Sequence, residues 1–458
     1  MTLTNIYINN LIRNLKKKIK KNEESRRTMS QKTPAWYEMQ MIKDMMGLFG
    51  GKAIRGITSA FSSSKIYMGK AGLSTMAQLI KAVIDKEDRR ALIIADSFTE
   101  KFSGKITEEL DFCEIEHKIF TGVEPEVPMA NVDSGAKVCE EFKPKVLIAV
   151  GGGSVIDAAK AIMIKYEKPD VNFHMMLPIG DPLGLRKKIR YLVAIPTTSG
   201  TGSEVTGAAI LTDTNRTPYK KLAISNPEIV PDIAILDSDF VEDMPPSLTR
   251  GSGLDAFAHS VGSYVSNWGN PLADALNIAA IKETLKYLPR AYKYGKGDIE
   301  ARSHMQLAAA IAGLGFSNTM PGIDHALGHS FGKIFKVHHG LAVGLFLPYT
   351  VGFQAKVTER WIDLCPVLGV KTEGKDKDAL LKEFLAALKE FNHSLDGPSC
   401  VKELSEPTIT KEEYMEKIDI LADYADNDAV ALASYRALNI NILKKIYEYA
   451  WDGKDIDF

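Results

Sequence analysis

Between about residues 60 and 240, the chain alternates short apolar segments with helix-like segments. Four of the apolar segments, at 91–95, 146–150, 192–195 and 233–236, contain only Ala, Val, Leu and Ile. Strands that are apolar at every position have both faces buried, which is typical of a parallel sheet with helices on both sides. The alternation therefore predicts an α/β domain built on a parallel sheet.

The alternation ends at Met244-Pro245-Pro246. Beyond this point the chain is rich in Ala and Leu at helical spacing, for example at 272–287, 305–315, 378–391 and 438–451. This spacing predicts a second, all-helical domain. We therefore divide the sequence into an N-terminal extension (1–57), an α/β domain (58–244) and an all-helical domain (245–458).

Composition excludes several classes of protein. The 458 residues are 45% hydrophobic, which is enough for large cores and excludes an intrinsically disordered chain. The net charge of −1 gives no support to nucleic-acid binding through bulk charge. The sequence contains no run of about 18 apolar residues, so we expect no membrane span. Four scattered cysteines without a CxxC pair predict free thiols in a reducing compartment, which we take to be the cytoplasm.

The N-terminal extension differs from the rest of the chain in charge. Residues 1–30 contain eight Lys or Arg and two Asp or Glu. Apolar residues recur among the lysines at helical spacing (Ile8, Leu11, Ile12, Leu15 and Ile19), which predicts a basic amphipathic helix. A second amphipathic helix is predicted at 35–48. The basic helix is a candidate for an organelle transit peptide, for docking to a partner, shell or membrane surface, or for packing on its own protein or a partner subunit.

A glycine-rich segment, Gly151-Gly152-Gly153-Ser154, lies between an apolar segment and a predicted helix at 155–165. Phosphates bind where glycines let the backbone approach closely and a helix N-terminus presents free N–H groups. The segment is not a GxGxxG motif, because Ile156 stands at the third glycine position, and it is not a Walker A motif. A tight turn without a ligand is the alternative. A second loop at 197–203, rich in Thr and Ser, follows another apolar segment and favours ligand binding at the strand ends.

Asp96 ends the apolar segment 91–95. A carboxylate at this position can accept hydrogen bonds from both ribose hydroxyls of a dinucleotide, and it would repel a 2′-phosphate. Alternatively, Asp96 caps a following helix. Its position alone favours neither interpretation.

Histidines gather in the helical half. Asp255 and His259 are four residues apart, as are His325 and His329, so each pair lies on one face of a helix. His339 and the adjacent His338 follow. One such pair is usually core packing, but two pairs and a further histidine favour a metal site. Carboxylate and imidazole ligands without thiolates suit Fe²⁺, Mn²⁺ or Zn²⁺. Asp324, beside His325, is interpreted as a surface or capping acid.

These features together resemble the iron-dependent (group III) alcohol dehydrogenase family. The matching stretches are GGGSVIDAAKAI (151–162), AIPTTSGTGSEVT (194–206), MPPSLTRGSGLDAFAH (244–259) and MPGIDHALGHSFGKIFKVHHGLAVGLFLP (320–348). The resemblance covers about residues 64–458 and leaves out the N-terminal extension.

The resemblance implies a role for particular residues. The metal ligands would be Asp255, His259, His325 and His339. His329 matches a family histidine implicated in proton transfer, and Phe316 matches a position that often lines the substrate pocket. His338 stands where relatives often have proline and is not taken as a ligand. The positions that match cofactor contacts are Asp96, Gly152, Gly153, Ser154, Asp157, Thr197, Thr198, Thr201, Lys221 and Leu248. One departure is Glu126, where relatives commonly have asparagine.

The implied activity is an NAD(H)-dependent interconversion of a small primary alcohol or diol and its aldehyde, with hydride transfer from an alkoxide held by Fe²⁺. Asp96 and Glu126 favour NAD(H) over NADP(H). The resemblance also implies at least a homodimer. Alternatives that stay open are a zinc-dependent polyol dehydrogenase, a non-redox relative similar to dehydroquinate synthase, and an assembly component docked through its N-terminal helix.

Overall fold

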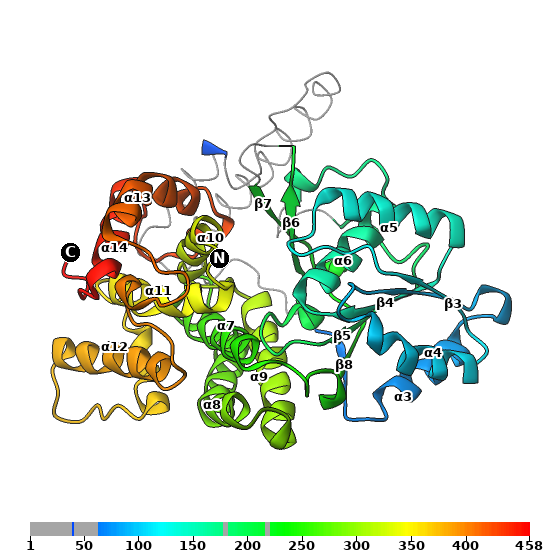
Figure 1. Ribbon diagram of the computed structural model, residues 1–458, viewed down its shortest axis with the longest axis horizontal. Coiled ribbons are helices and arrows are strands. Elements are labelled where there is room, and N and C mark those ends of the chain that lie inside the picture. The colour runs from blue at the N-terminus through cyan, green and yellow to red at the C-terminus, as the bar shows by residue number, and fades with distance from the viewer. Residues whose placement is uncertain (1–38, 41–62, 177–181, 216–219) are drawn as a thin grey trace, which may run out of the picture.

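The computed structural model describes residues 39–40, 63–176, 182–215 and 220–458 (Figure 1). The basic N-terminal helix predicted from the sequence lies outside these residues, and so does almost all of the helix predicted at 35–48. Within the described part of the chain, no helix is both long and apolar enough to cross a membrane.

Six strands form one parallel sheet in the order β1-β8-β5-β4-β2-β3. Their bounds are β1 Lys65–Met68, β2 Arg90–Ile94, β3 Glu116–Phe120, β4 Val146–Gly151, β5 Tyr191–Pro196 and β8 Ile233–Leu236. The four apolar segments of the sequence are β2, β4, β5 and β8, which confirms the predicted parallel sheet.

Helices cover both faces of the sheet. The helices α3 (Gly72–Val83) and α4 (Ser103–Phe112) share a core with Ile93 of β2 on one face. The helices α5 (Met129–Phe142) and α6 (Gly153–Glu167) share a core with Leu92 on the other. Successive strand residues point to opposite faces, so both faces of each central strand are buried. This burial explains why these strands are apolar throughout.

The order of the strands brings three loops together. β4 lies between β2 and β5, and the register pairs Ile94 with Ala149 and Gly151 with Pro196. All three strands are parallel, so the residues that follow them meet at the carboxyl edge of the sheet. Asp96, the glycine-rich segment 151–154 and the loop 197–203 are therefore neighbours.

An antiparallel hairpin, β6 (Ala208–Asp213) and β7 (Lys220–Ser225), stands apart from the sheet (Figure 1). The simple alternation of strands and helices does not anticipate it. The hairpin is anchored to α6 by a polar contact, because the N–H of Ile210 donates to Asp157 Oδ2 at 2.9 Å. It is thus an addition to the predicted architecture.

The chain after residue 245 is helical. Its helices are α7 Pro246–Val265, α8 Pro271–Tyr294, α9 Ile299–Ser317, α10 Asp324–Phe335, α11 His339–Gln354, α12 Lys377–His393, α13 Lys411–Asp426 and α14 Ile440–Asp452. Every residue from Gly251 to Val265 and from Gly340 to Gln354 is buried. Helices buried on all sides have no polar stripe, so α7 and α11 carry little helical periodicity in their sequences.

The two parts pack against each other. Val205, Ala234 and Leu236 from the α/β part form a small core with Ala310 of α9. In Figure 1 the helical part lies on the left and the sheet on the right, with the hairpin between them at the top. The parallel sheet with a helical C-terminal part confirms the predicted fold class.

Candidate metal and dinucleotide site

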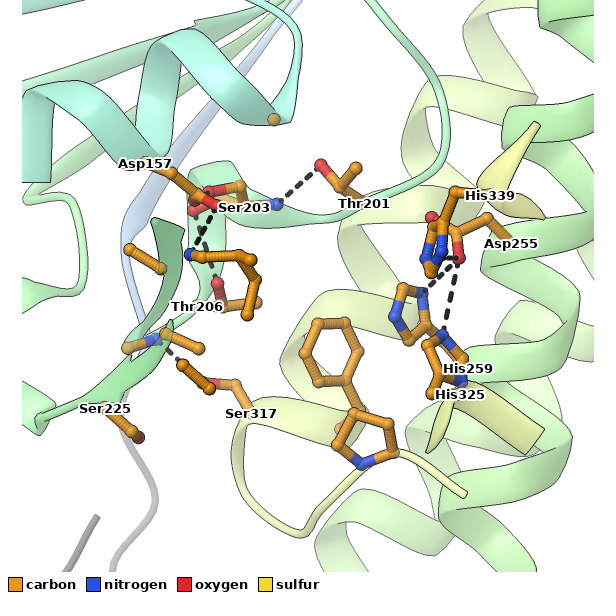
Figure 2. Close-up of a pocket in the computed structure, with 18 of the residues that line it drawn as sticks. Asp157, Thr201, Ser203, Thr206, Ser225, Asp255, His259, Ser317, His325 and His339 are labelled. Carbon is orange, nitrogen blue, oxygen red and sulfur yellow. Dashed lines mark hydrogen bonds and ion pairs between the residues drawn. The ribbon is translucent and has the colours of Figure 1, made fainter. Parts of the chain in front are cut away.

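One cavity of about 1250 Å³ lies between the carboxyl edge of the sheet and the helical part. Its lining includes every residue that the sequence suggested for the site: Asp96, Gly152, Gly153, Ser154, Asp157, Thr197, Thr198, Thr201, Lys221, Leu248, Asp255, His259, Phe316, His325, His329 and His339. Figure 2 shows two polar groups on opposite sides of this cavity, one around Ser203 and one around Asp255.

The glycine-rich segment lies where α6 begins and faces the loop 197–203. A Cβ atom on Gly153 would lie 2.8 Å from Thr201 Cγ2, and one on Gly152 would lie 3.3 Å from the methyl of Thr198. A side chain at position 153 would therefore push against Thr201, while one at position 152 would require only a small shift of Thr198. Within the described part of the chain, no side chain caps the N-terminus of α6, so its first N–H groups are available to an anion such as a pyrophosphate.

A buried polar network holds the second loop in place. Asp157 accepts hydrogen bonds from Ser203 Oγ at 2.6 Å and from the N–H of Ile210 at 2.9 Å. Lys160, which is fully buried, donates to Ser203 Oγ at 2.8 Å and to the carbonyl of Ala208 at 2.6 Å. Both oxygens of Asp157 are thus engaged within the protein, although Asp157 lines the cavity. Burial lowers the pKa of Lys160 to about 8 and raises the pKa of Asp157.

Lys160 is not among the site residues predicted from the sequence. It lies within the quoted stretch GGGSVIDAAKAI, but nothing in a single sequence shows that its ammonium group is enclosed. The pocket-facing loop depends on this group, since Ser203 bonds to it and to Asp157.

Asp96 caps the turn that follows β2. Its Oδ1 accepts hydrogen bonds from the N–H groups of Phe98 at 2.9 Å and Thr99 at 2.8 Å. Asp96 therefore acts as a capping residue through its Oδ1 atom. Asp96 also lines the cavity, and its Oδ2 makes no hydrogen bond within the described part of the chain, so the ribose interpretation stays open for Oδ2. Phe98 lies beside it and is 79% exposed.

Glu126, Lys221 and Leu248 line the same cavity. Glu126 has a φ of 64°, in the left-handed region that asparagine enters more easily than glutamate. Its carbonyl accepts a hydrogen bond from Thr212 Oγ1 at 2.6 Å, which ties this turn to the hairpin. The position is thus held by its backbone while its side chain differs from the common family residue.

The metal-ligand candidates converge on one carboxylate oxygen. Asp255 Oδ1 lies 3.2 Å from His339 Nε2, 3.4 Å from His325 Nε2 and 3.7 Å from His259 Nδ1 (Figure 2). The ligand atoms of Asp255, His325 and His339 all lie within 4.8 Å of one another, while His259 is not part of that tight set. Its ring stacks on His325 with centroids 4.3 Å apart.

Buried polar atoms without partners show what this group of side chains fits. Asp255 Oδ1, His259 Nδ1 and His325 Nε2 are all buried and have no hydrogen-bond partner in the described part of the chain. Buried polar atoms are normally paired, so several unpaired ones around one point are typical of a cation site. One carboxylate and three imidazoles fit a divalent ion such as Fe²⁺ or Zn²⁺.

Close packing of two helices brings the metal-ligand candidates together. A Cβ atom on Gly340 would lie 1.8 Å from the carbonyl oxygen of Gly251 and 3.0 Å from Asp255 Cβ. Gly340 directly follows His339 at the start of α11, and Gly251 lies one helical turn before Asp255 on α7. The absence of a side chain at this crossing therefore sets the distance between His339 and Asp255.

The protonation of the group follows from burial and charge. Burial alone would raise the pKa of Asp255, but the surrounding imidazoles hold it well below its ordinary value. Burial lowers the pKa of His259 to about 3 and that of His339 to about 4. Burial would also lower the pKa of His325, but Asp324 and Asp255 raise it to about 9. Two of the three imidazoles are therefore neutral at pH 7 and ready to bind a metal.

The interpretation of Asp324 as a surface or capping acid is wrong. Asp324 is buried and makes no capping hydrogen bond to any described residue, and its Oδ2 lies 2.6 Å from His325 Nδ1. A carboxylate that accepts the Nδ1–H of a ligand histidine fixes the ring and directs Nε2 to the metal. The i, i+1 position hid this contact, because neighbours on an ideal helix point in different directions.

The remaining site residues predicted from the sequence surround the metal-ligand candidates. Phe316 stacks on His259 with centroids 4.2 Å apart and forms an apolar wall of the cavity. His329 stacks on His339 with centroids 5.0 Å apart, and its Nδ1 lies 2.8 Å from Asp428 Oδ2. The sequence carried no signal for Asp428, which is 99 residues away. His338 lines the cavity and stands at the N-cap position of α11.

Comparisons with known proteins show the family of this chain. Residues 63–238 match the family described as iron-containing alcohol dehydrogenase, and residues 249–451 match the C-terminal part of the Fe-containing alcohol dehydrogenase family. The NADPH-dependent butanol dehydrogenase of Clostridium saccharobutylicum is 34% identical over 403 residues, which cover 86% of this chain and 98% of that protein. The NAD-dependent methanol dehydrogenase of Bacillus methanolicus is 29% identical over 399 residues, covering 86% and 100%.

A solved structure shares the architecture of most of this chain. The iron-containing alcohol dehydrogenase from Thermococcus thioreducens is 30% identical, with a TM-score of 0.75, and the match covers 87% of this chain and 100% of that chain. The fold and these matches define an oxidoreductase that interconverts alcohols and aldehydes. The chain belongs to the iron-containing alcohol dehydrogenase family.

Proposed function

We propose that this protein is an NAD(H)-dependent dehydrogenase that interconverts a small primary alcohol or diol and its aldehyde at a bound Fe²⁺. The observation that supports this most is that the glycine-rich loop and the metal-ligand candidates around Asp255 line the same cavity. A dinucleotide whose pyrophosphate lies at the start of α6 and a substrate at the metal group would thus share one enclosed space. In this division of labour the α/β part (58–244) holds the dinucleotide and the helical part (245–458) holds the metal.

The residues of the chain have separate tasks in this reaction. A bound Fe²⁺ would act as a Lewis acid toward the alcohol oxygen, and a bound nicotinamide would accept the hydride. Asp255, His259, His325 and His339 would hold the ion, and Asp324 orients His325. Phe316 limits the space beside His259 and excludes water from the reacting carbon. The packed loops at Gly153 and Thr201 position the dinucleotide, and proximity then favours the transfer.

The ligand assignment is tested by removing a histidine. The His339→Ala variant is expected to lose bound iron, measured per chain after dialysis, together with turnover of 1-butanol and NAD⁺. His393→Ala is the matched control, because His393 is on the surface at the end of α12. A His339→Ala protein that keeps both iron and turnover would show that the ligand set is wrong. Metal analysis of the wild-type protein separates iron from zinc.

Two acidic side chains support NAD(H) over NADP(H). Asp96 and Glu126 line the cavity, and either carboxylate would repel a 2′-phosphate. The relatives include both an NADPH-dependent and an NAD-dependent enzyme, so the preference for one dinucleotide is inferred from Asp96 and Glu126. We expect a higher kcat/KM with NAD⁺ than with NADP⁺, and a smaller ratio in Asp96→Gly. An unchanged ratio in that variant would remove Asp96 from the proposal.

The substrate is tested with a panel of alcohols and aldehydes, with NADH absorbance as the readout. Net NADH formation from simple alcohols distinguishes this function from that of a non-redox relative. We also propose a homodimer in a reducing compartment such as the cytoplasm. All four cysteines are buried and unpaired, which supports the reducing compartment. Sedimentation analysis tests the dimer, and localisation of full-length and 58–458 chains tests docking through the extension.

A further inference from the structure

A carboxylate from the far end of the chain contacts a histidine of the site. Asp428 lies between α13 and a short 3₁₀ helix, η12 (Ala429–Ala433), and its Oδ2 lies 2.8 Å from His329 Nδ1. Both side chains are mostly buried, at 18% and 16% exposure. Neither residue of the pair is a metal-ligand candidate, but the ring of His329 stacks on that of His339.

This contact determines which nitrogen of His329 faces the cavity. An ionised carboxylate can only accept a hydrogen bond, so in the neutral imidazole the proton is on Nδ1 and the lone pair is on Nε2. Nε2 makes no hydrogen bond within the described part of the chain, and it is not among the buried unpaired atoms. His329 lines the cavity, so Nε2 is the nitrogen that can meet a ligand there.

Asp428 is itself held firmly. Its Oδ1 accepts a hydrogen bond from the N–H of Val430 at 3.0 Å, and Ala429 packs into the core of the α/β part. Asn267, which follows α7, donates from Nδ2 to the carbonyl of Ser434 at 2.9 Å. The segment is thus anchored to both parts of the protein, and it places the carboxylate at one defined point beside His329.

We propose that Asp428 is a positioning residue that acts through His329 on the orientation of the substrate hydroxyl. Asp428 holds Nδ1–H, so the lone pair of Nε2 is aimed at the cavity, where it accepts a hydrogen bond from the O–H of the alcohol. In alcohol oxidation the O–H bond breaks, and the proton leaves along this hydrogen bond to solvent. The carbinol carbon loses its hydride to the nicotinamide, and the aldehyde leaves. This inference rests on the proposed function.

The Asp428→Asn variant separates positioning from capping. Asparagine caps as well as aspartate, so the contact to Val430 is kept while the charge beside His329 is removed. We expect kcat with the iron-loaded full chain to fall about 10- to 100-fold, with unchanged iron content and unchanged KM for NAD⁺. Asp376→Asn is the control, because Asp376 caps α12 through Ala379 on the surface and should keep wild-type turnover. An unchanged kcat in Asp428→Asn would overturn the proposal.

A double variant shows whether Asp428 acts through His329. If it does, Asp428→Asn should have no further effect on kcat in a His329→Ala background. Two independent losses that multiply would indicate a merely structural role and would overturn the proposal.

A spectroscopic readout does not depend on turnover. In protein labelled with [¹⁵N]histidine, the His329 signals are those that disappear in His329→Ala. The wild type should show the form with Nδ1 protonated, and Asp428→Asn should shift it toward the other tautomer. The same tautomer in both proteins would overturn the proposal. If the wild type oxidises no alcohol, the proposed function fails, while the nitrogen signals still decide the role of Asp428.

Discussion

Gly340→Ala tests whether the α7–α11 crossing determines metal binding. The new Cβ would lie 1.8 Å from the carbonyl oxygen of Gly251, while ordinary contacts begin at 3.4 Å, so the helices must separate by about 1.6 Å. Because His339 precedes Gly340, this movement would lengthen the 3.2 Å distance between His339 Nε2 and Asp255 Oδ1 to as much as about 4.8 Å. In metal sites, the distances from the ion to its ligand atoms deviate from their ideal values by only about 0.2 Å.

The expected result is a folded protein that has lost its metal. Removing a residue that hydrogen-bonds to a metal ligand typically lowers the affinity for the metal about 10- to 100-fold. Displacing a ligand itself should therefore lower that affinity more than about 100-fold. Overpacking should also lower the free energy of unfolding by ~1–3 kcal/mol. Chelator competition measures the first effect, and chemical denaturation measures the second.

A matched glycine provides the control. Gly104 lies in the first turn of α4, and a Cβ there would meet no atom of the described residues within 4 Å. Gly104→Ala should bind metal normally and be as stable as the wild type, or more stable by about 0.4–1 kcal/mol. A Gly340→Ala protein with wild-type metal affinity would refute the reasoning, because it would show that the crossing can open without moving the ligands.

Three further predictions follow from the buried charges. Asp324→Asn should weaken metal binding about 10- to 100-fold in chelator competition, because His325 loses the carboxylate at its Nδ1; wild-type affinity would contradict this role. The pKa of His325 is raised to about 9 in the metal-free protein, so this imidazole carries an extra proton at pH 7 that the metal must displace. Metal affinity should therefore rise with pH up to about 9, and calorimetry in two buffers should show about one proton released at pH 7; no release would count against it. Lys160→Met should lower the free energy of unfolding by about 3–5 kcal/mol, since it leaves the buried Asp157 without its cation. Lys377→Met, which breaks an exposed ion pair with Glu359, should change it by less than about 1 kcal/mol, and equal losses would refute the argument from burial.

The strands were predictable where local sequence and tertiary environment agree. Segments such as 146–150 are buried on both faces, so their composition alone reports the parallel sheet. The hairpin β6–β7 was not predictable, because its place depends on a polar contact with Asp157. The helices α7 and α11 were also hard to delimit, since burial on all sides removes the periodic signal that exposes helices such as α12.

The metal-ligand candidates were visible in the sequence because Asp255 and His259 lie four residues apart on one helix, as do His325 and His329 on another. Helical geometry converts a spacing of four into a shared face, which needs no tertiary information. The contact between Asp324 and His325 was missed because it depends on side-chain rotation within a buried turn. Asp428 could not be found at all, since 99 residues separate it from His329.

The sequence by itself therefore determined the layer architecture, the two loops that follow β4 and β5, and the set of acid and imidazole side chains. These properties are local, because they depend on periodicity and on glycines beside strand ends and helix starts. Only the tertiary structure decided how the side chains are used. It placed Gly340 against Gly251, enclosed Lys160 with Asp157, and brought Asp428 to His329. Such contacts join segments far apart in the chain, and their distances are set by helix packing, which no local pattern records.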